Sequence, residues 1–174
     1  MRVLLLSAGY GTRLGEATKK TPKPMIQVGD KPLIELIIDN LALHGLDQLI
    51  VNLHYLPEVV IKKIQSRALY YYEPKLLGHK GTIFALRKWL EGEPFMVINA
   101  DTSTNVNYTE MILNHKPHTI TVCMDEYRAT GTWIYPADYF TNPDLPLIPY
   151  RPPNLDWQDI GTPERLEKAR AKYA

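Results

Sequence analysis

The chain lacks the long apolar runs, charge imbalance and paired cysteines that mark several large protein classes. Over 174 residues its formal net charge is +1, which argues against a bulk polyanion such as nucleic acid as a partner. No apolar run is long enough to cross a bilayer, so we expect no membrane partner. Cys123 is the single cysteine, so no internal disulfide framework can form, and its apolar surroundings predict a buried strand thiol.

Several familiar site signatures are also missing. The P-loop pattern of Gly-Lys followed by Ser or Thr is absent, and the first glycine-rich turn lacks the third glycine of the dinucleotide-binding fingerprint. The histidines show no zinc-ligand spacing. No cleavable signal pattern precedes the first apolar run, so we expect a cytoplasmic protein. The length favours one domain, residues 1–174, with a sizeable core.

Apolar patterns divide the chain into alternating strands and helices. They predict strands at 3–6, 49–53, 68–72, 95–99, 119–124 and 132–135, and helices at 32–43, 57–65, 81–90, 107–114 and 163–172. This alternation is typical of an α/β fold with a mixed, mainly parallel sheet, in which ligands gather at the carboxyl ends of the strands. The proline-rich segment 141–154 is expected to be an irregular, mobile loop.

A glycine-rich turn, Ser7 to Arg13, follows the first predicted strand. Backbone N–H groups at such a turn, together with the Arg13 guanidinium, can bind an anion such as a chain of phosphates. Lys23 follows between two prolines, which hold its backbone stiff. Two cations near a glycine turn favour a ligand with several negative charges. The alternatives are an ordinary tight connection and a solvated surface lysine.

Two aspartates lie at the ends of predicted elements, where a carboxylate can have either a structural or a metal-binding role. Asp101 follows the continuous apolar strand 95–99, where a carboxylate either caps a turn or binds a metal ion. Asp159 precedes the last predicted helix, where it could simply support the turn. From the residues alone, both interpretations stay open.

Taken together, segments 7–14, 22–25 and 31–34 resemble the signature of the sugar-1-phosphate nucleotidyltransferases, of which this chain would be a short member. The segment Asp159-Ile160-Gly161-Thr162-Pro163 resembles a second motif of that family. The resemblance implies a three-layer α/β/α sandwich of the nucleotide-diphospho-sugar transferase type. It also implies Mg²⁺-dependent transfer of a nucleoside monophosphate from a nucleoside triphosphate to a sugar 1-phosphate, with release of pyrophosphate. Many family members carry a proline before the position of Thr18, and this chain does not.

The resemblance also assigns roles to single residues. It implies that Asp101 and Asp159 hold Mg²⁺, that Arg13 neutralises the β and γ phosphates, and that Lys23 lies near the α-phosphate or the incoming sugar phosphate. Arg13, Lys23 and Asp101 are thereby the expected catalytic residues. The expected nucleotide-binding residues are Ala8, Gly9, Gly11, Thr12, Arg13, Gly78 and Gly81.

The acceptor side departs most from the family. Many relatives carry a Glu-Lys-Pro string whose lysine contacts the sugar phosphate, and no such string occurs here. The resemblance makes Gly131, in the stretch that stands for the family's sugar-side strand, and Arg151 the expected substrate-binding residues. Arg151 either replaces the missing lysine or is a surface arginine. A non-sugar acceptor such as phosphocholine, or a non-catalytic nucleotide-binding role, are the alternatives. The sequence leaves open the base, the sugar, the pathway and homo-oligomerisation.

Overall fold

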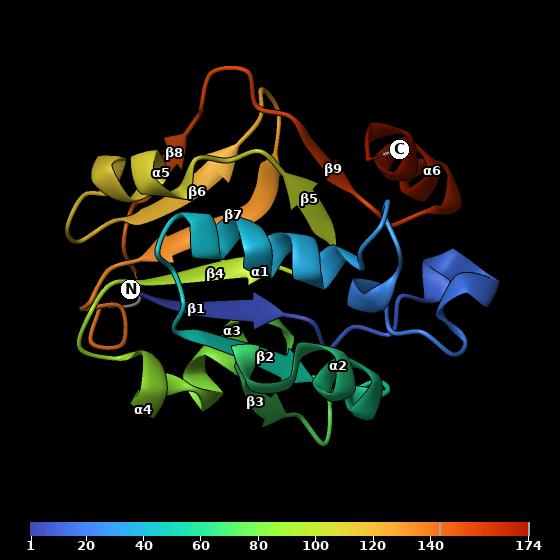
Figure 1. Ribbon diagram of the computed structural model, residues 1–174. Coiled ribbons are helices and arrows are strands. Elements are labelled where there is room, and N and C mark those ends of the chain that lie inside the picture. The colour runs from blue at the N-terminus through green and yellow to red at the C-terminus, as the bar shows by residue number, and fades with distance from the viewer. Residues whose placement is uncertain (143, 174) are drawn as a thin grey trace.

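A seven-stranded sheet forms the centre of the computed structural model, which describes residues 1–142 and 144–173 (Figure 1). The strands lie in the order β3-β2-β1-β4-β7-β6-β8. Their bounds are β1 Arg2–Leu6, β2 Leu49–Leu53, β3 Leu69–Tyr72, β4 Phe95–Asn99, β6 Ile120–Met124, β7 Ala129–Tyr135 and β8 Leu147–Tyr150.

Helices cover both faces of this sheet and complete a three-layer α/β/α sandwich. One apolar core joins the sheet to α1, α2, α5 and α6, and a second joins its other face to α3 and α4. In Figure 1, α1 crosses in front of the sheet and α3 lies behind it. The helices are α1 Leu33–Leu43, α2 Pro57–Ile64, α3 Gly78–Ala85, α4 Arg87–Leu90, α5 Tyr108–Asn114 and α6 Pro163–Lys172. Short 3-10 helices span η1 Thr12–Thr18, η2 Lys23–Met25 and η3 Gln65–Arg67.

The strand sequences explain why both faces are covered. Successive side chains of a strand point to opposite faces. In β1, Val3 and Leu5 therefore enter the first core while Leu4 enters the second. In β4, Met96 likewise joins the first core and Val97 the second. A strand buried on both sides needs a continuous apolar run, which is the pattern that predicted these strands.

Pairing directions confirm the mixed, mainly parallel sheet. Strands β3, β2, β1 and β4 run parallel, β7 is antiparallel to both β4 and β6, and β8 is parallel to β6. The four parallel strands therefore end at one edge of the sheet. The turn after Leu6 and the residues after Asn99 meet there, since these two residues are direct partners in the register of β1 and β4.

Three sequence-based expectations need correction. The predicted helix 81–90 is two helices that begin earlier, at Gly78, and break at Leu86, where φ is −94° and ψ 11°. The segment 141–154, expected to be irregular, contains β8, which pairs with β6. The sequence also missed a second, two-stranded antiparallel sheet of β5 (Thr102–Thr104) and β9 (Trp157–Asp159). These short strands have no apolar pattern, and their pairing joins segments far apart in the chain.

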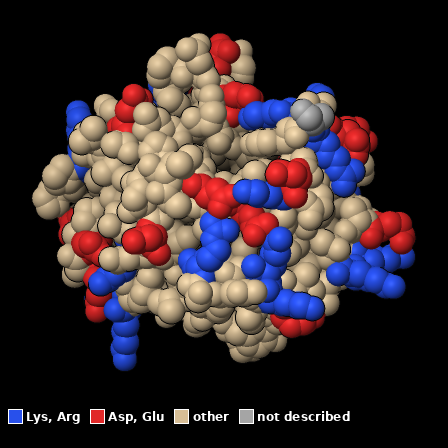
Figure 2. Space-filling view, viewed as in Figure 1, with Lys and Arg blue, Asp and Glu red and all other residues tan. Residues whose placement is uncertain are grey.

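The surface carries mixed charge. Glu35 and Asp39 of α1 pair with Lys31, Lys63 and Arg67, and Lys31 Nζ lies 2.9 Å from Oδ2 of Asp39. In Figure 2 basic and acidic side chains are interleaved across this face of the molecule, in keeping with the small net charge. No helix in the described part of the chain is both long and apolar enough to span a membrane. Cys123 is buried in β6, as expected.

Candidate active site

The glycine-rich turn after β1 is held by backbone geometry and by the segment that follows it. Gly11 has φ +67°, a value that favours glycine. A Cβ at Gly11 would lie 2.9 Å from Cγ2 of Thr18 and 3.1 Å from Cβ of Lys23. The Thr18 hydroxyl donates to the Gly11 carbonyl at 3.1 Å. The turn therefore packs directly on the segment that carries Lys23.

A hollow of about 190 Å³ opens beside this turn, at the carboxyl ends of β1 and β4. The hydroxyl of Ser7 is buried there and has no hydrogen-bond partner among the described residues, so a bound ligand could supply one. The lining residues are Leu6, Ser7, Gly9, Lys23, Pro24, Asn99 and Asp101. Two predicted catalytic residues and one predicted nucleotide-binding glycine thus share one hollow.

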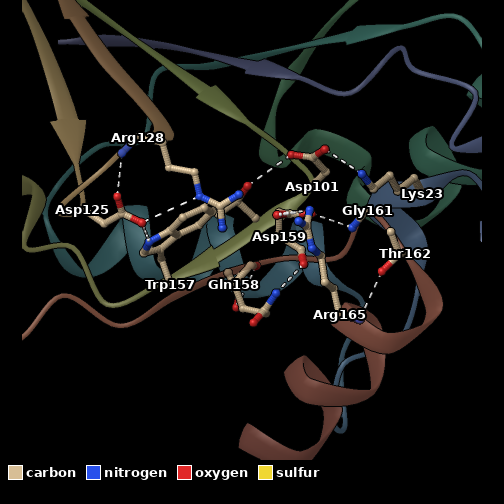
Figure 3. A network of polar contacts seen from close by, with 12 residues as sticks. Lys23, Asp101, Asp125, Arg128, Trp157, Gln158, Asp159, Gly161, Thr162 and Arg165 are labelled. Carbon is tan, nitrogen blue, oxygen red and sulfur yellow. Dashed lines mark hydrogen bonds and ion pairs between the residues drawn. The ribbon is translucent and has the colours of Figure 1, made fainter. Parts of the chain in front are cut away.

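Both predicted metal ligands lie at this place, each paired with a cation (Figure 3). Lys23 Nζ lies 2.6 Å from Oδ2 of Asp101. Arg165 Nη1 donates to both carboxylate oxygens of Asp159, at 2.9 and 2.8 Å. Asp159 is the register partner of Thr102 in the β5–β9 sheet, and Ile160 N donates to the Asp101 carbonyl at 3.0 Å. The small sheet therefore brings together two carboxylates that are far apart in sequence.

Asp159 is held in its ionised form. Burial alone would raise its pKa, but the hydrogen bond from the Gly161 N–H and the contacts with Arg165 outweigh burial, so the pKa lies below its usual range. The Gly161 N–H lies 2.9 Å from Oδ1 of Asp159. A Cβ at Gly161 would lie 2.7 Å from that same oxygen and 3.1 Å from Arg13 Nη2. Arg13 and Arg165 therefore both lie close to this carboxylate.

A second hollow, of about 210 Å³, adjoins the first, since Leu6 and Gly9 line both. Glu73 is completely buried at its wall and is held by three donors. Asn52 Nδ2 donates to it at 2.9 Å and the Leu77 N–H at 3.0 Å, and the Thr82 hydroxyl donates as well. The residues lining this hollow are Leu6, Ala8, Gly9, Asn52, Glu73, Leu76, Gly78, His79 and Thr82.

Two histidines near these hollows have different surroundings. His54 Nδ1 lies 2.7 Å from the Glu73 carbonyl, which can only accept, and its Nε2 lies 2.7 Å from the Tyr10 hydroxyl. His54 therefore ties the glycine turn to the end of β3, a structural role. His79 lines the second hollow with its Nε2 2.8 Å from the Tyr135 hydroxyl. Burial, and next the charge of Lys80, lowers the pKa of His79.

Some of the remaining predicted binding residues lie beside the first hollow, and others lie away from it. Gly131 of β7 lies against it, since a Cβ there would meet Asn99 at 3.2 Å. Thr12 lines a different hollow, together with Tyr10 and Tyr55. Gly81 lies one turn further along α3 than Gly78, with Leu77 as its neighbour.

Arg151 is an exposed residue that follows β8, the edge strand three positions from β4. At about 4.8 Å per strand this is roughly 14 Å across the sheet. No hydrogen bond or ion pair between Arg151 and either carboxylate is found among the described residues. Its role on the acceptor side stays a prediction. Arg165 is the additional cation that contacts a predicted metal ligand.

Sequence reasoning missed Glu73, Asn52 and Arg165. A signal existed for Arg165: it is six residues after Asp159, in the first turn of a helix whose start, at Thr162, was recognisable. Thr162 accepts a hydrogen bond from the Arg165 N–H at 3.4 Å, as an N-cap does. Asn52 lies near the end of β2 and Glu73 directly follows β3, a signal of the same kind as that of Asp101. Their hydrogen bond to each other joins two separate segments and could not be predicted from either one alone.

The donor set fits a hard divalent cation. Asp101 and Asp159 lie on adjacent segments, since Asp159 pairs with Thr102 and the Ile160 N–H donates to the Asp101 carbonyl. No group of three or more potential ligands among His, Cys, Asp and Glu is found in the described part of the chain. Mg²⁺ is commonly bound by one or two carboxylates, with phosphate and water oxygens completing its shell.

Comparison with known proteins connects these residues to a family. The family model described as nucleotidyl transferase matches residues 2–131. Mannose-1-phosphate guanylyltransferase 1 of Arabidopsis thaliana is 33% identical over 128 residues, covering 68% of this chain and 36% of that protein. The mannose-1-phosphate guanylyltransferase catalytic subunit beta of Xenopus tropicalis is 29% identical over 152 residues, covering 79% of this chain and 42% of that protein. The chain thus spans less than half the length of these relatives.

Solved structures share the fold at lower identity. HddC from Yersinia pseudotuberculosis, complexed with GMP-PN, matches with a TM-score of 0.83 and 21% identity, covering 99% of each chain. UDP-glucose pyrophosphorylase from Acinetobacter baumanii matches with a TM-score of 0.80 and 15% identity, covering 99% of this chain and 92% of that one. These likenesses confirm a fold of the nucleotide-diphospho-sugar transferase type. With the family model matching most of its length, the chain belongs to the nucleotidyl transferase family.

Proposed function

We propose that this chain transfers a nucleoside monophosphate from a nucleoside triphosphate to a sugar 1-phosphate and releases pyrophosphate. The observation that carries the proposal is the convergence of Lys23, Asp101, Asp159 and Arg13 beside one glycine-lined hollow. Relatives named as mannose-1-phosphate guanylyltransferases support the same class of reaction.

Both substrates are anions, so the site must offset their repulsion. Two unit charges about 4 Å apart repel by about 1 kcal/mol in water, and by about 4 kcal/mol at an effective dielectric constant of about 20. The Arg13 and Lys23 side chains supply two of the required positive charges, and the N–H groups of the glycine turn add hydrogen-bond donors. We propose that Mg²⁺, held by Asp101 and Asp159, would add charge stabilisation at the α-phosphate.

The reaction needs no protein nucleophile. An oxygen of the acceptor phosphate forms a bond to the α-phosphorus, and the bond from that phosphorus to the bridging oxygen of the β-phosphate breaks. Pyrophosphate leaves with the electron pair. In this scheme Arg13 stabilises the leaving β and γ phosphates, while Lys23 positions the α-phosphate. The adjoining hollow beside Asn52 and Gly78 is the proposed place for the base.

A pyrophosphate-release assay tests this proposal. The four common ribonucleoside triphosphates and thymidine triphosphate would be combined with hexose and heptose 1-phosphates and with phosphocholine, with and without chelator. The first pair to test is GTP with mannose 1-phosphate, the pair suggested by the relatives' names. We expect acceptor-dependent and Mg²⁺-dependent release with at least one sugar 1-phosphate. Pyrophosphate release with phosphocholine alone would show that the acceptor is not a sugar 1-phosphate. Absence of pyrophosphate release with every pair would contradict the proposed function.

A further inference from the structure

The carboxylate of Asp159 already has a cationic partner within the protein, the Arg165 guanidinium. Arg165 Nη1 contacts both of its oxygens, and the Gly161 N–H takes a further position on Oδ1. A carboxylate offers about four lone-pair positions. Three of them are therefore used within the protein, and the guanidinium charge lies directly against the carboxylate.

This arrangement conflicts with the role proposed for Asp159. A divalent cation that binds both Asp101 and Asp159 would have to approach Arg165 and Lys23, which hold these two carboxylates. Arg165 can withdraw, because its side chain is 38% exposed and begins on the first turn of α6. Asp159 is more enclosed, at 18%, and its Gly161 contact fixes it to the backbone.

We propose that Arg165 is an exchangeable counter-ion that competes with the divalent cation for Asp159. In the free protein it balances the charge of the carboxylate, and it lowers the affinity of the site for a metal ion. It withdraws when a divalent cation arrives. The inference rests on the proposed function, because it takes Asp159 as a metal ligand.

The exchange has a consequence for the order of binding. Phosphate oxygens add negative charge to the site, and they offer the freed guanidinium a new partner of matching geometry. A divalent cation that arrives with the triphosphate therefore meets less opposition than a cation alone. Arg165 would thus keep the free protein poor in metal and favour entry of the cation together with the nucleotide.

Equilibrium binding of Mn²⁺ to the substrate-free protein, followed by electron paramagnetic resonance, tests the proposal without any need for turnover. Arg165→Gln removes the counter-ion and should tighten Mn²⁺ binding at least threefold relative to the unmodified chain. Arg170→Gln is the matched control, because Arg170 lies on the same helix but contacts Glu167 and the Gln27 carbonyl instead. Its Mn²⁺ affinity should stay within about 1.5-fold of the unmodified chain.

A purely structural role for Arg165 predicts the opposite result. If Arg165 only held Asp159 in place, its removal would loosen a ligand and weaken Mn²⁺ binding. Unchanged or weaker binding in Arg165→Gln would therefore overturn the inference. The double variant Arg165→Gln/Asp159→Asn should lose the increase in Mn²⁺ affinity. If the increase persists in the double variant, Mn²⁺ binds at a site other than Asp159, and the inference is overturned.

The two proposals can fail separately. If pyrophosphate release is found but Arg165→Gln leaves Mn²⁺ affinity unchanged, the counter-ion inference fails and the proposed function stands. If Arg165→Gln tightens Mn²⁺ binding and no pair of substrates reacts, the proposed function fails while the competition for Asp159 stands. Thermal melting of each variant checks that the fold is retained.

Discussion

At the scale of single residues, the site depends on carboxylates whose partners differ. Asp101 and Asp159 each face a cation beside an open hollow, where a ligand can compete for them. Glu73 is completely buried and satisfied by fixed donors from other elements. The first two are suited to bind and release an ion, whereas Glu73 positions the wall of the second hollow.

Removing the Glu73 carboxylate should destabilise the fold. In Glu73→Ala the buried Asn52 Nδ2 and the part-buried Leu77 N–H lose an acceptor, whereas the Thr82 hydroxyl keeps the Gly78 carbonyl at 2.9 Å. Each unsatisfied buried group costs about 1–3 kcal/mol. We expect the free energy of unfolding, measured by urea denaturation, to fall by about 3 kcal/mol or more.

Glu126→Ala is the control for this measurement, because Glu126 is exposed in the turn between β6 and β7. A surface change of this kind should alter the free energy of unfolding by less than about 0.5 kcal/mol. Equal effects of the two substitutions would contradict the structural role of Glu73.

At the residue level, the sequence could single out candidates where the chemistry follows a local pattern. Lys23 between prolines, Asp101 after a buried strand and Asp159 before an N-cap could all be singled out, and the structure places them together. For Arg151 the two alternatives, an acceptor-side cation and a surface arginine, both remain. The path of a proline-rich segment is hard to predict from its sequence. Here the segment contains β8, the edge strand of the sheet, and Arg151 directly follows it.

At the scale of elements, the turn after β1 contains two glycines with different surroundings. Gly9 and Gly11 are both in this turn, but only Gly11 has positive φ and close neighbours in Thr18 and Lys23. A Cβ added at Gly9 would meet no atom within 4 Å beyond its chain neighbours, and Gly9 lines both hollows. The two glycines therefore serve different purposes: Gly11 shapes the turn, and Gly9 leaves room for a ligand.

Alanine substitutions should separate these purposes. Gly11→Ala combines a strained backbone with crowding, and we expect the free energy of unfolding to fall by about 2 kcal/mol. Gly9→Ala should change stability by less than about 0.5 kcal/mol while weakening nucleoside triphosphate binding, measured by calorimetry. The assignment is wrong if Gly9→Ala proves the more destabilising of the two.

The long elements were predictable and the short ones were not. Strands β1, β2 and β4 have continuous apolar runs because helices cover both of their faces, and such runs are visible in the sequence. Strands β5 and β9 have three residues each and gain their order only by pairing with each other. The sequence of neither segment alone predicts that β5 and β9 pair.

At the scale of the whole molecule, segments early and late in the sequence both contribute residues to the site. The family model covers residues 2–131, so it includes the glycine turn, Lys23 and Asp101 but not Asp159. The chain returns through β9 to place Asp159 and α6 beside the turn. The fold class could be predicted because the alternation of strands and helices spans most of the chain, whereas this return could be anticipated only through the resemblance of its motif.

Global stability should depend on pH through two enclosed histidines. Burial lowers the pKa of His115, and burial followed by the charge of Lys80 lowers that of His79. The unfolded chain therefore binds protons more readily than the folded one as the pH falls through about 6.5, the ordinary histidine value. We expect the free energy of unfolding to decrease between about pH 7.5 and about pH 5.5, as measured by urea denaturation.

The double variant His79→Gln/His115→Gln should show a weaker dependence over the same range, because it lacks the two groups that drive it. An unchanged slope in that variant, or stability that rises on acidification, would refute the assignment.

The most direct measurement compares steady-state pyrophosphate release by the unmodified chain with that of Asp101→Asn and Asp159→Asn, using the best substrate pair at saturating Mg²⁺. Each substitution keeps the size of the side chain but removes the negative charge proposed to hold the cation. We predict that kcat/KM falls at least 100-fold in both variants, about 2.7 kcal/mol of transition-state stabilisation. Release at the unmodified rate in either variant would contradict the two-carboxylate account.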